Sequence, residues 1–282
     1  MMTLRNGREE GIPYSLSRWT DVPAAKWAWF LDTLAERKMV AFDPRTAVPS
    51  LWSMHPEDTL GLVFWTKDPS NIIRDRKQLR DYHLKIHVTV TGWEEVEKGA
   101  PSLTEGAQLL ARAAGTFGPE NVFWRFSPVP MVPDVVERFR SIASVASPAG
   151  VSEVFLAFLQ ENDLMPERRS EEERRALLDR LAEIGQSFGI KVLLCNDDHR
   201  LFDGRTDRHA NLGLGICARP EDFPNPAGAK PIPENCGCVL MVDPFTINES
   251  CTFGCQYCYA ADKSLSDKKR NTTRQLPIIR GT

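Results

Sequence analysis

The sequence predicts an α/β fold, and in particular a single, partial TIM-like β/α barrel. Two observations predict it. The chain has 282 residues, 42% of them hydrophobic, which is enough to bury one large core. Short apolar runs of strand type also alternate with segments of helical periodicity, a pattern typical of a mainly parallel sheet with crossover helices. We expect the barrel to span residues 1–259, with a separate polar tail at 260–282.

The first half of the chain divides into four strand-helix pairs. Strand-like runs lie at 14–17, 60–65, 84–91 and 122–126. Asp21 is placed to cap the first helix, with Pro23 in its first turn. A polar helical segment is expected at 71–81, a helix opened by the capping box of Ser102 and Glu105 ends before Gly118, and an amphipathic helix covers 134–145.

The second half continues this order and then loses it. A strand is expected at 154–159, and Ser170 with Glu173 forms a second capping box, opening a helix that ends at Gly189. Another strand follows at 190–194. The stretch 209–235 is rich in glycine and proline and is expected to be loop, and 239–245 is the last predicted strand.

Three cysteines near the C-terminus form the most informative motif. Cys251, Cys255 and Cys258 fall within eight residues, at spacings of four and three, with Gly254 between the first two and Tyr257 before the third. A [4Fe-4S] cluster normally takes four thiolates, so three would leave one iron open to a substrate or cofactor. A structural zinc site completed by a distant fourth ligand is the alternative from the residues alone.

The other four cysteines lie together in the segment 195–238. They are Cys195, Cys217, Cys236 and Cys238, and four thiolates are the number that closes a metal shell. A second iron-sulfur cluster or a zinc ion could hold this loop-rich segment together. Alternatively, Cys195 and Cys217 are simply buried as small hydrophobic residues.

Several polar side chains stand at or near the ends of predicted strands, where the chemistry of β/α barrels gathers. Arg18, Lys67, Arg125 and Gln160 are therefore the candidates for a substrate pocket, although arginines in such places also form structural ion pairs. The three cations favour an anionic substrate. They do not identify it.

Composition excludes some partners and leaves others open. The net charge of −3 gives no general attraction to nucleic acid or anionic membranes. No apolar run is long enough to cross a bilayer, and the first residues lack the apolar core of a signal peptide, so we expect a cytoplasmic protein with reduced thiols. The tail at 260–282 has six basic against two acidic residues, which suits either a frayed end or a phosphate contact.

The chain also resembles an uncharacterised bacterial family, a domain of unknown function whose C-terminal cysteines resemble those of radical S-adenosylmethionine (SAM) enzymes. The resemblance is carried by SRWTDVP at 17–23, FWTKDP at 64–69, TG at 91–92, WRF at 124–126, CGCV at 236–239 and NESCTFGCQYCYA at 248–260. In radical SAM barrels the cysteine loop usually follows the first strand. Here it follows the last predicted one, so the resemblance implies a circularly permuted barrel.

The resemblance implies a specific chemistry. Cys251, Cys255 and Cys258 would hold three irons of a [4Fe-4S] cluster, SAM would bind the fourth, and Tyr257 would pack near the adenine. An electron donor such as flavodoxin or ferredoxin would reduce the cluster, and hydrogen would be removed from an unidentified small-molecule, nucleotide or macromolecular substrate. The rival hypothesis is a zinc-stapled nucleic-acid-binding or structural protein without redox chemistry, for which the basic tail would supply the contact.

Overall fold

Seven parallel strands form the main sheet of the protein, seen here in a computed structural model. The structure describes residues 3–43, 46–130, 132–159, 170–195, 201, 209–225, 228–229, 237–246, 251–258 and 260. The strands are β2 (Tyr14–Leu16), β5 (Leu62–Thr66), β6 (Leu84–Thr89), β7 (Val122–Phe126), β8 (Glu153–Leu156), β9 (Lys191–Cys195) and β10 (Leu212–Gly215). Their spatial order, β10-β9-β8-β7-β6-β5-β2, follows the chain without a jump. The predicted α/β class with a parallel sheet is therefore confirmed.

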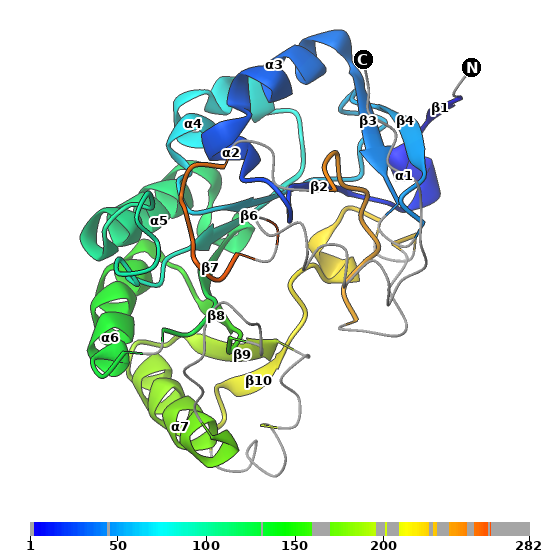
Figure 1. Ribbon diagram of the computed structural model, residues 1–282. Helices are drawn as coiled ribbons and strands as arrows, with labels where there is room; N and C mark the ends of the chain where they lie inside the picture. The colour runs from blue at the N-terminus through cyan, green and yellow to red at the C-terminus, as the bar shows by residue number, and fades with distance from the viewer. Residues whose placement is uncertain are drawn as a thin grey trace.

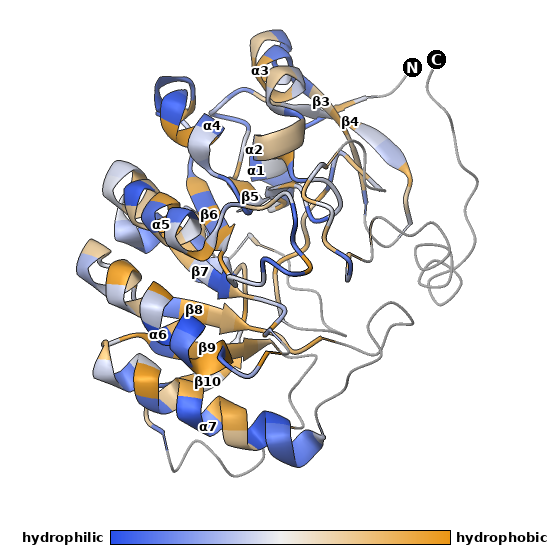
Figure 2. Cartoon of the chain, turned by 60° about the vertical axis from the view of Figure 1, so that its left-hand side comes forward, coloured by the Kyte–Doolittle hydropathy of each residue, from blue (hydrophilic) through white to orange (hydrophobic). Residues whose placement is uncertain are grey.

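The helices lie along one face of this sheet (Figure 1). They are α2 (Val22–Ala25), α3 (Trp27–Glu36), α4 (Ser70–Arg74), α5 (Leu103–Phe117), α6 (Val135–Ala146) and α7 (Glu171–Ser187). Short 3-10 turns are η1 (Arg76–Leu79), η2 (Pro119–Asn121), η3 (Ser147–Ala149) and η5 (Pro220–Asp222). Figure 2 shows both hydrophobic and hydrophilic residues on α5, α6 and α7, as expected for helices with one buried side.

Local sequence signals placed these helices well. Both capping boxes are present, with Ser102 and Glu105 opening α5 and Ser170 and Glu173 opening α7. The Asp21 side chain accepts a hydrogen bond from the Ala24 N–H and caps α2 as predicted. The polar segment at 71–81 is not one helix, however, because it breaks at Asp75 into α4 and η1.

Strand β10 lies where the sequence analysis expected only loop, and that prediction was wrong. Its sequence is Leu-Gly-Leu-Gly, and glycine weakens the local preference for a strand. The neighbouring strand explains why glycine suits the place. A Cβ on Gly215 would lie 3.0 Å from the Phe155 ring and 3.2 Å from the Leu193 side chain.

A second, three-stranded sheet was not predicted. It contains β1 (Leu4–Arg5), β3 (Lys38–Phe42) and β4 (Pro49–Ser53), with the short helix α1 (Gly7–Glu10) after β1. The β3–β4 pair is antiparallel, and β1 pairs with β4 in parallel. This sheet packs into the helix-side core through Trp52, which is fully buried and contacts Tyr14 of β2 edge-on.

The predicted last strand, at 239–245, is described up to Phe245 but pairs only at isolated positions. Val242 bridges to Tyr14 in parallel, and the Ser15 N–H donates to the Val242 carbonyl at 2.8 Å. At its other end the Val239 N–H donates to the Ala218 carbonyl, three residues beyond β10, at 2.9 Å. This segment thus has hydrogen bonds to β2 at one edge of the sheet and to the chain just beyond β10 at the other.

The inner face of the sheet, opposite the helices, has its own small hydrophobic core. Its members are Leu60, Val63, Ala218, Phe223, Ala229, Val239 and Met241, with Trp65 partly buried against them. Residues 218–225, 229 and 239–241 therefore contribute side chains that cover part of the inner face. None of the helices in the described part of the chain is long and apolar enough to cross a membrane.

Candidate functional site

The cysteine loop, residues 251–258, lies against the segment that follows β6. The Gly99 N–H donates to the Phe253 carbonyl at 2.9 Å, and the Gln256 N–H donates to the Val96 carbonyl at 3.0 Å. Glu97 and Cys255 face each other across an antiparallel bridge. Phe253 is buried and anchors the middle of the loop. The three thiols are thereby held beyond the carboxyl end of a central strand, where sites form in parallel α/β folds.

The contact between Gly99 and the cysteine loop requires a residue without a side chain. A Cβ on Gly99 would lie 2.5 Å from the Thr252 carbonyl oxygen and 2.9 Å from the Phe253 Cα. Both of these are backbone atoms, so neither can rotate out of the way. Glycine at this position lets two backbones approach closely enough for their hydrogen bond.

The three thiols are partly buried and influence one another electrostatically. Burial raises the pKa of the Cys255 thiol to about 12; the Lys67 ammonium opposes this rise, and the Cys258 and Cys251 thiols add to it. Burial also raises the pKa of the Cys251 thiol, while hydrogen bonds from the backbone of Phe253 and Asp21 lower it. A cation or metal beside the thiols would favour their deprotonated form, which is the form that ligates metal.

The arrangement of these donors bears on what they could hold. Among the residues that the structure describes, no three histidine, cysteine or carboxylate side chains gather closely enough to hold a metal ion. A single zinc ion needs all its sulfurs about 2.3 Å from one point. In a [4Fe-4S] cluster each thiolate binds a different iron, so its ligands need not converge on one ion. Three partly buried thiols on one short loop suit the cluster in number and chemistry.

A buried polar network, centred on the segment that follows β6, packs against the cysteine loop. Its centre is the Glu97 carboxylate, which forms an ion pair with the Lys67 Nζ at 2.9 Å and accepts the Thr91 hydroxyl at 2.8 Å. The Tyr257 hydroxyl also donates to Glu97. The Tyr257 ring stacks on Trp93 with 5.8 Å between ring centroids, and the Lys67 Nζ lies 5.8 Å from the Tyr257 ring centroid.

Glu97 was not among the residues that the sequence singled out. It belongs to a charged stretch, WEEVEK, that gives no local sign of which acid turns inward. The nearest signal was its place shortly after a buried strand. Lys67, by contrast, was predicted for a substrate pocket, and the structure places its ammonium on Glu97 beside the cysteine loop.

Asp21 connects the start of α2 to the cysteine loop. Its carboxylate accepts the Thr66 hydroxyl at 2.8 Å and the Lys67 N–H at 2.9 Å, in addition to capping α2. Burial raises the pKa of Asp21 to about 6 despite these donors. The same residue's backbone hydrogen-bonds the Cys251 thiol. The end of β5, the start of α2 and the first cysteine therefore meet at one place.

The remaining predicted pocket residues separate into two groups. Arg125 donates to the Cys217 sulfur at 3.2 Å, and its guanidinium carbon lies 5.1 Å from the centroid of the Trp65 ring. The Arg18 Nε lies 4.0 Å from the Asp243 carboxylate, which is a structural ion pair of the kind anticipated for such arginines. Gln160 lies outside the described residues. The structure thus brings together Arg125 and Cys217, and leaves Arg18 with Asp243.

The proposed second cysteine site comprises Cys195, Cys217, Cys236 and Cys238, of which Cys236 lies outside the described residues. Cys195 ends β9 and stands beside Gly215 of β10 in the register of the sheet. The Cys217 sulfur accepts a hydrogen bond from Arg125, and Cys238 is buried. A second cluster or a zinc ion on these thiols stays a prediction.

Four aromatic rings pack together on the inner face of the sheet, next to Arg125. His87 is fully buried, lies parallel to Trp65 with 4.3 Å between ring centroids, and lies against Phe123 at 5.0 Å on its other side. Phe155 contacts it edge-on at 5.5 Å. Burial, assisted by the Arg125 charge, holds the pKa of His87 well below its usual value. The imidazole is therefore neutral in the folded protein near neutral pH.

His87 should make the protein lose stability in acid, and His87→Phe should reduce that loss. The unfolded chain binds a proton near pH 6.5, whereas the folded chain does not, so stability falls as pH drops below 6.5. The slope from one such group is about 1.4 kcal/mol per pH unit until the folded-state pKa is reached. Urea unfolding at several pH values between 7 and 5 would measure it. Parallel pH profiles for variant and wild type would contradict this assignment.

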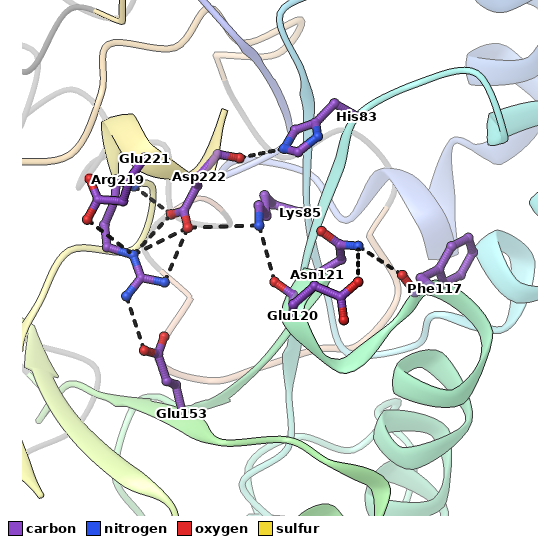
Figure 3. Close-up of polar contacts among 9 residues, drawn as sticks. All are labelled: His83, Lys85, Phe117, Glu120, Asn121, Glu153, Arg219, Glu221 and Asp222. Atoms are coloured by element: carbon purple, nitrogen blue, oxygen red, sulfur yellow. Dashed lines mark hydrogen bonds and ion pairs between the residues drawn. The ribbon is translucent and has the colours of Figure 1, made fainter. Parts of the chain in front are cut away.

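The opposite, amino-terminal end of the sheet carries a separate charged network, shown in Figure 3. Asp222 of η5 lies 3.9 Å from the Lys85 Nζ and 3.2 Å from the Arg219 guanidinium, which also meets Glu153 at 3.1 Å. Burial lowers the pKa of Lys85 even though Asp222 opposes the shift. These pairs attach the chain after β10 to β6 and β8, and they lie at the end of the strands away from the cysteine loop.

Comparisons with known proteins give a family but no activity. No curated protein matches the chain. A similar solved structure is D-psicose 3-epimerase with D-tagatose from Clostridium cellulolyticum H10, which is 13% identical and matches over 74% of this chain and 92% of its own, with a TM-score of 0.40. A family model described as a domain of unknown function (DUF1848) matches residues 14–260, and the chain belongs to that family.

Proposed function

We propose that the protein is a radical SAM enzyme in which Cys251, Cys255 and Cys258 hold a [4Fe-4S] cluster. The observation that carries the proposal is the set of three partly buried thiols, spaced by four and three residues and fixed by backbone hydrogen bonds beyond the end of β6. When bound, such a cluster with one open iron supplies reductive cleavage of SAM and, through it, removal of a hydrogen atom from a substrate.

The chain's own residues would bind and orient rather than react. Phe253 and the backbone of 96–99 hold the loop in place, and Gly254, with a φ of 60°, makes the turn between the first two thiols. The Tyr257 ring stacks on Trp93, and its hydroxyl donates a hydrogen bond to Glu97. These two contacts fix the residue that precedes Cys258. An adenine contact for Tyr257 belongs to this proposal. As in other cofactor enzymes, the protein's contribution is placement and exclusion of water.

A permuted β/α barrel is the finer fold that accompanies this function. Its support is the segment at 239–245, which hydrogen-bonds to β2 and to the chain beyond β10. In the proposed barrel this segment would take the place of an eighth strand. The cysteine loop then follows the strand position next to β2. On the inner face of the sheet, Arg125 remains the proposed substrate contact. The proposed redox partner is a low-potential one-electron donor such as flavodoxin or ferredoxin.

Anaerobic reconstitution tests the proposal. Purified protein given iron and sulfide should take up about four irons for the loop cluster. It should also convert SAM to methionine and 5′-deoxyadenosine in the presence of dithionite. A colourless protein that holds zinc and leaves SAM intact under these conditions would rule the proposal out in favour of the zinc hypothesis.

Cys258→Ala should abolish SAM cleavage, down to the level of a protein-free control, because one of three cluster ligands is lost. Its thermal unfolding should stay close to that of the wild type without metal, since the thiol is only partly buried. Thr252→Ala, an exposed position in the same loop, is the matched control and should keep its iron and activity. Equal activity of the two variants would show that Cys258 is not a ligand.

A further inference from the structure

The ion pair between Lys67 and Glu97 lies beside the cysteine loop, where its charges would act on a bound cluster. Glu97 bridges to Cys255 through the backbone, and the Lys67 Nζ lies 2.9 Å from the Glu97 carboxylate. The pair is enclosed: the side chain of Glu97 is 5% exposed and that of Lys67 is 12% exposed. Charges so little exposed to water are weakly screened, so each acts on its surroundings.

We propose that Lys67 and Glu97 are a pair of positioning residues that sets the reduction potential of a cluster bound at Cys255. The inference rests on the proposed function, since it concerns the cluster that the three thiols would hold. The pair has no net charge when both groups are ionised. Within it, the ammonium favours the reduced cluster, and the carboxylate favours the oxidised one.

The sign of each effect follows from the electron that the cluster gains. Reduction adds one negative charge to a site that already contains three thiolates. A nearby cation stabilises that added charge and raises the potential, and a nearby anion does the opposite. Opposite effects from two adjacent residues are not expected from structural damage, which would disturb the loop in the same way whichever partner is removed.

The surrounding contacts keep each charge in place when the other is removed. Glu97 retains the hydroxyls of Thr91 and Tyr257 as donors when Lys67 is replaced. Lys67 retains the Tyr257 ring, 5.8 Å from its Nζ, when Glu97 is replaced. Cation-π contact of this kind holds an ammonium in a partly buried site. Single substitutions should therefore leave a net charge beside Cys255 without displacing it.

The test is a redox titration of the anaerobically reconstituted full-length protein, with dithionite as the electron source and the EPR signal of the reduced cluster as the readout. Glu97→Gln should raise the midpoint potential and Lys67→Met should lower it. Each shift should change the ratio of reduced to oxidised cluster by about tenfold at a fixed potential, which is about 59 mV for one electron. The double variant should return close to the wild type, and Lys67→Arg should stay there.

Glu95→Gln is the matched control. Glu95 lies two residues earlier in the same segment, is largely exposed and pairs with Arg138 at 2.8 Å, so its loss should not change the potential. Shifts in the same direction for Glu97→Gln and Lys67→Met, or no shift in either, would overturn the inference alone. A wild-type protein that assembles no cluster would overturn the proposed function and this inference together.

Discussion

A Gly99→Ala variant is expected to lose at least half of the iron that the wild type binds after reconstitution. The added methyl group would lie 2.5 Å from the Thr252 carbonyl oxygen and 2.9 Å from the Phe253 Cα, well inside contact distance. Because both neighbours are backbone atoms, the cysteine loop must move away from the 96–99 segment. The hydrogen bond from the Gly99 N–H to Phe253 would then break. Overpacking of this kind costs about 1–3 kcal/mol.

Gly115→Ala supplies the control for this prediction. Gly115 lies in α5 and is exposed, and a methyl group added there would meet no described residue outside its own helix within 4 Å. Alanine there should leave iron binding unchanged and raise stability by up to about 1 kcal/mol, because alanine is the better helix former. Iron content per chain, measured by a colorimetric assay with the unfolding temperature of each variant, separates the two. A Gly99→Ala protein that binds iron as fully as Gly115→Ala would mean that the docked loop is not needed for the cluster.

The parts of the fold that the sequence predicted are those fixed by local chemistry. Ser102 and Ser170 open helices because their side chains and the glutamates three residues later satisfy the free backbone groups of the first turn. Strand β7 was placed at its observed residues, 122–126, because its apolar run is bounded by turn signals on both sides. Neither inference needed any distant contact.

The parts that were missed depend on distant partners. Strand β10 is a strand because β9 pairs with it along its whole length, whereas its own two glycines suggest a loop. The small sheet joins Leu4 and Arg5 to residues 49–53, and two residues are too few to show a period. The same limit applies to 239–245, which was predicted as a full strand and pairs only at single bridges.

The candidate site divides in the same way. The thiol spacing is local and was visible at once, but the network behind it joins Glu97 to Tyr257 across 160 residues of sequence. Lys67 illustrates the difference. Its place at the end of a strand was predicted from the sequence, and the partner of its ammonium was not, because that partner is selected by the packing of the cysteine loop on the 91–99 segment.

Replacing Asp243 should cause the largest loss of stability of any change discussed here. Asp243 is 2% exposed and joins the segment at 239–245 to the first strand of the sheet. Its Oδ2 accepts the Ser15 hydroxyl at 2.9 Å and the Arg18 N–H at 3.0 Å; its Oδ1 accepts the Ser17 hydroxyl and the Phe245 N–H, the latter at 3.0 Å. Asp243→Ala removes the acceptor of these four hydrogen bonds and the carboxylate beside Arg18, and should cost about 3–5 kcal/mol.

Asp243→Asn makes the test sharper, because it keeps the shape of the side chain. Each carboxylate oxygen accepts one backbone N–H, so whichever oxygen becomes an NH₂ group leaves one buried N–H facing another donor. That mismatch should cost about 1–3 kcal/mol. Asp32→Asn, on the exposed side of α3, should stay within about 0.5 kcal/mol of the wild type. Urea unfolding of the three variants measures these differences. If Asp243→Asn were as stable as Asp32→Asn, the carboxylate would not be what holds the segment at 239–245 to β2.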